Sequence, residues 1–226
     1  MRKLIVSLAL VIFIYSVAEA APCYGTKMPQ QKNFFMGIGE HSIFKRYLED
    51  DQGNLKSMQE FLLLSYGVFD WLSIDLKGGA GDITQHSSSG NKVDYSTSFA
   101  GGYGFRLRFY DSDKVKMVFG FQHISVHPKH TYVDGVRQRA ILDDWQVSLL
   151  ASYDFGKITP YLGTRWSRMD YIHRNGEDHK RVMSDPDRNV GFILGFDLPF
   201  TKKIWLNLEG QFFDSQALSA SINYSF

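Results

Sequence analysis

Apolar and polar residues alternate position by position along most of this chain, and no other feature of the sequence constrains its fold as strongly. In VGFILGFDL, residues 190–198, every second residue is apolar, and the residues between them include Gly191, Gly195 and Asp197. Successive side chains of a β-strand point to opposite faces, so a period of two predicts a strand with one apolar face. Comparable segments are residues 72–77, 93–109, 144–154, 204–212 and 217–226, with weaker alternation in residues 33–44, 58–69, 115–127 and 158–168.

The connections between these segments fall into two length classes. Short turns at one end and longer polar loops at the other, joined by strands of about ten residues, indicate a transmembrane β-barrel. We therefore expect an all-β, antiparallel up-and-down barrel of about ten strands, with eight as the alternative. A soluble barrel or sandwich has no reason to sort its loops in this way. The short connections are expected at residues 69–71, 110–114, 155–157 and 200–203, and the longer ones near residues 48–56, 85–93, 128–139 and 172–188, with a short fifth near residues 214–216.

The first twenty residues have the composition of a secretory signal peptide. Arg2 and Lys3 precede an apolar stretch that ends in Ala18, Glu19 and Ala20, and cleavage is expected after Ala20. The apolar stretch is shorter than the roughly 20 residues of a membrane-spanning helix. We expect a signal peptide over residues 1–20, an N-terminal periplasmic tail over residues 21–32, and the barrel over residues 33–226.

Charge and cysteine content exclude several classes of function. The formal net charge is +1, which gives no electrostatic attraction to nucleic acid. The chain has one cysteine, Cys23, so it has neither an intramolecular disulfide nor the paired thiols of a zinc site. No cofactor and no metal is expected.

The C-terminal segment, INYSF, carries a resemblance to a known family. With alternating strands, a signal peptide and a terminal aromatic residue, the chain resembles the small bacterial outer-membrane β-barrel proteins. The resemblance implies an outer-membrane location, contact with outer-membrane lipid and lipopolysaccharide, and a monomeric state. It also implies that Ile222, Tyr224 and Phe226 form the signal read by the barrel-assembly machinery.

Charged residues of both signs fall on the polar faces of the expected strands. Charges inside a narrow barrel must be paired or solvated, so we expect them to cross-link the lumen and plug it. A narrow passive pore for small solutes remains the alternative. The expected lumen network is Asp75, Lys77, Arg106, Arg108, Asp144, Asp154, Arg165, Asp197 and Glu209.

All seven histidines are expected at strand ends or loops on the side of the longer loops, together with several cations. Arginine forms bidentate, charge-assisted bonds with phosphate, and histidine gains positive charge below about pH 6.5. These residues suggest contact with the phosphates of lipopolysaccharide. The expected contacts are Lys129, Arg137, Arg139, His173, Lys180 and Arg181, and Arg174 is a further cation that would supply a phosphate contact.

A second motif suggests catalysis. His123 and Ser125 share one face of a strand. If the hairpin across the loop at residues 128–139 is symmetric, Asp143 or Asp144 would lie near His123. Serine, histidine and a carboxylate are the parts of an activated nucleophile. The arrangement distantly resembles the outer-membrane lipid A deacylases. Two positions differ from that family: Val126 stands where the family often has asparagine, and the acidic residue is an aspartate where the family has glutamate. A protease dyad of Asp170 and His173 is disfavoured, because residues three apart point to opposite faces. The expected function is non-enzymatic, in a structural, adhesive or surface-interaction role, with a lipid A-modifying hydrolase as the second alternative after the pore.

Overall fold

The computed structural model describes residues 22–49, 52–175 and 182–226, and every regular element in these residues is a β-strand. The expected signal peptide lies outside the described residues. No helix in the described segments is long and apolar enough to cross a membrane. The strands of the barrel are β1 (Phe34–Tyr47), β2 (Asn54–Phe69), β3 (Leu72–His86), β4 (Lys92–Asp111), β5 (Val115–Val126), β7 (Val136–Tyr153), β8 (Thr159–Asn175), β10 (Val190–Pro199), β11 (Ile204–Phe212) and β12 (Gln216–Ser225).

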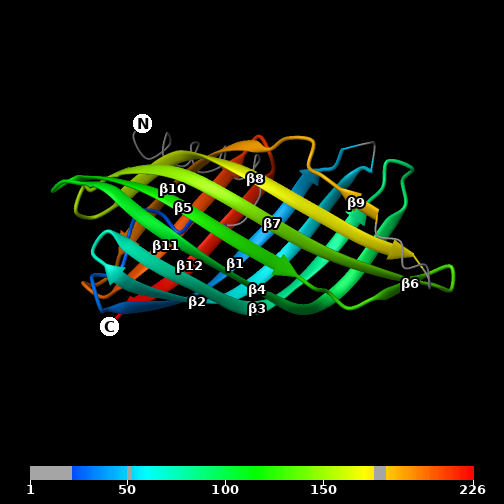
Figure 1. Ribbon diagram of the computed structural model, residues 1–226, viewed down its shortest axis with the longest axis horizontal. Coiled ribbons are helices and arrows are strands. Elements are labelled where there is room, and N and C mark those ends of the chain that lie inside the picture. The colour runs from blue at the N-terminus through cyan, green and yellow to red at the C-terminus, as the bar shows by residue number, and fades with distance from the viewer. Residues whose placement is uncertain (1–21, 50–51, 176–181) are drawn as a thin grey trace, which may run out of the picture.

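The sheet closes on itself because the first strand pairs with the last. Each barrel strand is antiparallel to the next along the chain, and β1 pairs with β12 from Phe35 opposite Ser225 to Lys45 opposite Gln216. Closure pairs the outer edges of β1 and β12 with each other, as a strand structure in lipid requires. The structure therefore confirms the expected up-and-down barrel of ten strands, shown in Figure 1.

Two further strands extend the barrel at one end. The short strand β6 (Thr131–Val133) pairs with β7, and β9 (Val182–Ser184) pairs with β8. Both lie at the end opposite the C-terminus (Figure 1). In outer-membrane barrels the short turns face the periplasm, so β6 and β9 mark the extracellular end.

The outward face of the wall is built for contact with lipid. Large apolar side chains such as Ile38, Leu162 and Phe192 are more than half exposed. Aromatic residues gather near the short turns, where Phe69 stacks on Trp71, as expected for the membrane interface. This outward apolar face also has polar residues: Glu40 and Glu60 lie opposite each other on β1 and β2 and are both exposed.

The alternation changes phase within β4, so the prediction that all its apolar residues share one face is wrong. Tyr95 and Phe99 were both assigned to the apolar face of one strand, but Tyr95 is buried in the interior while Phe99 is 62% exposed. The pairing of β3 with β4 shifts register between Gly81 and Ile83, at the same level. A β-bulge adds one residue to a strand and thereby reverses which face the later side chains occupy.

The segment before β1 lies inside the barrel and does not form the expected periplasmic tail. The backbone N–H of Cys23 donates to Glu209 Oε1 (2.8 Å), and the Pro22 carbonyl accepts from Gln122 Nε2 (2.8 Å). The side chains of Thr26 and Ser152 are 2.6 Å apart. These polar lumen residues give the segment the hydrogen bonds that water would give an exposed tail.

Candidate functional site

The periplasmic half of the lumen is organised around Arg106. Its guanidinium forms an ion pair with Asp75 (2.8 Å) and donates to Ser65 Oγ (3.0 Å) and to the carbonyl of Lys27 (2.8 Å). Arg106 is 1% exposed and Asp75 is 2% exposed. Because the same arginine joins the wall to the N-terminal segment, it fixes that segment inside the barrel.

Two further arginines cross-link the middle of the lumen. Arg165 bonds Asp214 (2.5 Å), and Arg46 bonds Asp144 (3.1 Å). Sequence reasoning missed Arg46 and Asp214. Arg46 follows a register shift in β1 that moves it to the inner face, and Asp214 was assigned to a surface loop.

The remaining residues of the expected lumen network divide into two groups. Lys77, Asp197 and Glu209 are buried in the interior, where the Lys77 amino group donates to Gln122 and Asp197 accepts from Asn207 (2.8 Å). Arg108 and Asp154 instead line a hollow of about 410 Å³ at the periplasmic mouth. Arg108 bonds Asp111 there, and Asp154 accepts from the backbone of the neighbouring turn.

The extracellular part of the lumen is filled by apolar side chains, whereas the sequence predicted a lumen filled by charged residues. A small hollow of about 10 Å³, room for about one water molecule, lies between this cluster and the polar network. A filled lumen leaves little room for a water path. The buried cluster consists of Ile43, Leu48, Leu55, Phe61, Ile83, Tyr95, Ala100, Ile124, Val126, Ala140, Leu142, Met169 and Tyr171.

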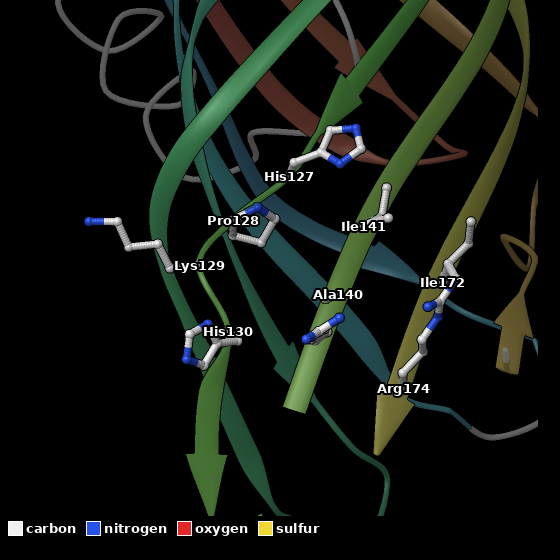
Figure 2. Close-up of a pocket in the computed structure, with 9 residues that line it drawn as sticks. His127, Pro128, Lys129, His130, Ala140, Ile141, Ile172 and Arg174 are labelled. Atoms are coloured by element: carbon white, nitrogen blue, oxygen red, sulfur yellow. The ribbon is translucent and has the colours of Figure 1, made fainter. Parts of the chain in front are cut away.

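A basic pocket lies on the extracellular part of the wall. It has a volume of about 310 Å³ and is formed by the connection from β5 to β6 on one side and by β7 and β8 on the other, as Figure 2 shows. Ile141 and Ile172, which pair across β7 and β8, give it apolar contact surface. The other lining residues are His127, Pro128, Lys129, His130, Arg139, Ala140 and Arg174.

Arg139 and Arg174 lie directly opposite each other in the pairing of β7 with β8. Like charges in this position repel and destabilise a strand pair. Among the described residues, neither arginine has an ion pair with a carboxylate. Both arginines line the pocket, so its described lining carries two facing cations.

The structure brings together only some of the residues expected to contact phosphate. Lys129 and Arg139 line the pocket, but the Lys129 side chain extends away from β7 and β8 in Figure 2. Arg137 lies on the adjoining hairpin, where its guanidinium is 3.2 Å from His130 Nδ1. His173 follows inward-facing Tyr171 at a spacing of two and its ring lies against that tyrosine, so it is on the opposite face of β8 from Arg174.

Lys180 and Arg181 lie outside the described residues. The expectation that every histidine lies at the extracellular rim is wrong for His41, which is 1% exposed inside the barrel on β1. His41 occupies a polar-phase position that alternation alone would have assigned to the lumen. Ile141 and Ile172 were absent from the expected contact set, and the opposition of Arg139 and Arg174 became visible only with the pairing of β7 and β8.

A polar cluster lies on the same outer face, on the membrane side of the pocket. Ser125 Oγ is 2.7 Å from His127 Nε2 and also donates to Asp143 Oδ1. Asp143 Oδ1 is in turn 3.8 Å from His123 Nε2. The acidic residue beside Ser125 is Asp143, whereas Asp144 points into the lumen towards Arg46.

No family model matches this chain, and no curated protein sequence matches it. Solved structures do match. An outer membrane channel from Pseudomonas putida F1 has a TM-score of 0.51 at 10% identity, covering 92% of this chain and 100% of that one. The outer membrane protease OmpT from Escherichia coli matches with a TM-score of 0.48 at 10% identity over 89% and 99% of the two chains. The chain thus has the fold of the bacterial outer-membrane β-barrels, and its closed sheet and lipid-facing apolar wall are those of an outer-membrane protein.

Proposed function

We propose that this protein is a closed outer-membrane barrel that binds the phosphate groups of outer-leaflet lipid, in particular lipopolysaccharide, in the basic pocket. The observation that carries the proposal is the direct opposition of Arg139 and Arg174 beside an apolar surface. A phosphate between two guanidinium groups would relieve their repulsion and accept charge-assisted hydrogen bonds from both. Ile141 and Ile172, the next outward pair towards the membrane, would contact the carbon skeleton of the headgroup between the phosphate and the acyl chains.

The position of the pocket supports a lipid ligand over a soluble one. Trp145 and Trp166 are exposed on β7 and β8, nearer the periplasmic end than the two arginines. Tryptophan is enriched at the membrane interface, so the arginines, which lie six and eight positions further along their strands, are on the extracellular side of the apolar core, where lipid headgroups lie. A role in surface interaction agrees with this geometry.

The test is binding of purified lipopolysaccharide by the refolded protein at low ionic strength, where surface electrostatics are least screened. The double variant Arg139→Gln/Arg174→Gln should bind at least about tenfold more weakly than wild type, since each charge-assisted bond is worth roughly 1.5 to 3 kcal/mol. The control variant Lys114→Gln/Lys202→Gln removes the same number of charges at the periplasmic end of the barrel. It should bind lipopolysaccharide like wild type. Equal affinities for all three proteins would overturn the proposal.

The closed lumen is tested separately, because a narrow pore is the competing function. The N-terminal segment, the ion pairs of Arg106 and Arg165, and the apolar cluster fill successive levels of the interior. We expect the refolded protein to give no steady single-channel conductance in a planar bilayer. Discrete, reproducible conductance steps would favour the pore.

A further inference from the structure

The Ser125 cluster combines a hydroxyl, an imidazole and a carboxylate at contact distance on the lipid-facing wall. The 2.7 Å between Ser125 Oγ and His127 Nε2 is within the range of a nucleophile and its general base. The hydroxyl has one proton and donates it to either Asp143 or His127 at any moment. When it donates to His127, the imidazole is placed to remove that proton.

Pairing across the strands places this cluster at a defined level of the membrane. Ser125 pairs with Asp143 on β7. The next outward row towards the membrane core holds His123 and Trp145, whose rings are 4.1 Å apart. In the opposite direction come the row of Ile141 and then the row of Arg139.

This order of rows matches the order of groups in a membrane lipid, which runs from acyl chains through ester linkages to phosphate. Asp143 and Arg139 are four positions apart on β7, about 13 Å along a strand at 3.3 Å per residue. A strand tilt of about 40° reduces this to about 10 Å along the membrane normal. A lipid with its phosphate at Arg139 and Arg174 would therefore have its ester linkages near Ser125.

We infer that Ser125, with His127 as general base, hydrolyses a carboxylic ester of a phosphorylated membrane lipid bound in the basic pocket. The choice of lipid rests on the proposed function, whereas the chemistry rests on the Ser125 contacts alone. Asp143 is a positioning residue, because it contacts the serine hydroxyl and places a negative charge near the imidazole ring of His123. The inference goes beyond binding and assigns an activity to the outer face of the barrel.

The reaction balances with water as the only co-reactant. Ser125 Oγ attacks the ester carbonyl carbon while His127 takes the hydroxyl proton, and the bond to the alcohol oxygen then breaks as the alcohol leaves with that proton. Water attacks the resulting acyl-serine, His127 takes a proton from the water, and the fatty acid departs as Ser125 regains its proton. One ester and one water give one alcohol and one carboxylic acid.

The first test is independent of lipid binding and uses a fluorophosphonate probe on the folded barrel in detergent. Attack by Ser125 would form an oxygen–phosphorus bond and release fluoride, and mass spectrometry would locate the label. His127→Ala should slow labelling at least about a hundredfold, the usual contribution of a general base. Asp143→Asn should also slow it, and Asp143→Glu, which keeps the carboxylate, should recover part of the rate.

The chain offers a matched control serine. Ser42 also lies on the outer face and donates to a carboxylate, Glu40 (2.7 Å), but no histidine contact to it is found in the described part of the chain. Ser42→Ala should be labelled like wild type, and Ser125→Ala should not be labelled. Labelling of folded wild type at neither serine, or at Ser42 and Ser125 equally, would overturn the inference even if lipopolysaccharide binds.

The second test identifies the source of the ester. Folded wild type and Ser125→Ala are incubated separately with purified lipopolysaccharide and with phospholipid vesicles of phosphatidylethanolamine and phosphatidylglycerol, and released fatty acid is measured. Release by wild type alone from one of these lipids supports hydrolysis and names the substrate. If fatty acid is released from neither lipid, or if Ser125→Ala releases as much as wild type, hydrolysis by Ser125 is overturned. Loss of lipid binding in the arginine double variant with probe labelling intact would show that the two proposals are separate.

Discussion

The ring of Phe226, the last residue, stacks on the ring of Phe34 at the start of β1, with centroids 4.3 Å apart. The backbone N–H of Phe226 also donates to the Phe34 carbonyl (3.2 Å). The C-terminus therefore completes the seam at which β12 meets β1. Its aromatic ring lies in the periplasmic girdle beside Tyr224, whose ring centroid is 4.9 Å away.

Removal of this contact should impair barrel assembly. In Phe226→Ala the seam loses its terminal ring stack, and we expect less folded protein in the outer membrane than for wild type, measured by the gel mobility shift on heating. Phe155→Ala removes another exposed aromatic residue near the periplasmic turns and is the control, because Phe155 lies away from the seam. Equal folded amounts for the two variants would contradict this role of Phe226.

The buried ion pair of Arg106 with Asp75 should contribute far more to stability than the exposed pair of Arg108 with Asp111. Arg106→Ser leaves a buried carboxylate without its cation, which typically costs about 3 to 5 kcal/mol. Arg108→Ser breaks a pair whose aspartate is 42% exposed, and such pairs contribute about 1 kcal/mol or less. Urea unfolding in detergent micelles should separate the two variants, and similar midpoints would argue against the buried cross-link.

The barrel was predictable from sequence because strand periodicity and loop length both follow directly from membrane geometry. The alternation around Phe192, Leu194 and Phe196 arises because one face of β10 contacts lipid and the other faces the filled interior. It failed at Tyr95 and Arg46, since a single extra residue in a bulge reverses the face without any change in composition. Apolar residues near the extracellular end were also ambiguous, because a packed lumen and a lipid face both accept them.

The candidate site was predictable only in part. The basic residues near Arg139 were visible as a cluster, but the opposition of Arg139 and Arg174 depends on the register of β7 with β8. For Ser125 the sequence indicated His123 as the nearby imidazole, whereas the hydrogen bond is made by His127. His127 lies two positions after Ser125, so alternation places both histidines on the face of Ser125, but the sequence does not show which imidazole contacts the hydroxyl. The burial of residues 22–29 had no sequence signal, since their partners are spread over strands distant in sequence.

The lumen position of the N-terminal segment predicts that Cys23 resists alkylation in the folded protein. Burial raises the pKa of the Cys23 thiol, and the thiolate is the reactive form. We expect maleimide to modify Cys23 only after the barrel is unfolded in urea. The control is Lys157→Cys in a Cys23→Ser background, which places a thiol in an exposed turn and should react at once. Equally fast modification of folded wild type would place the segment outside the lumen.

Because Arg139 and Arg174 repel each other, replacing one of them should stabilise the barrel, whereas most substitutions destabilise a protein. In phosphate-free buffer of low ionic strength, Arg174→Gln removes one of two facing like charges and should raise the thermal unfolding midpoint of the barrel. Inorganic phosphate should stabilise wild type, by about 1.4 kcal/mol at a concentration ten times its dissociation constant, because only the folded pocket binds it. Arg174→Gln should lose most of that gain, whereas Lys114→Gln at the other end of the barrel should keep it. If Arg174→Gln is less stable than wild type without phosphate and responds equally to phosphate, then the two arginines are held apart by other contacts and form no anion site.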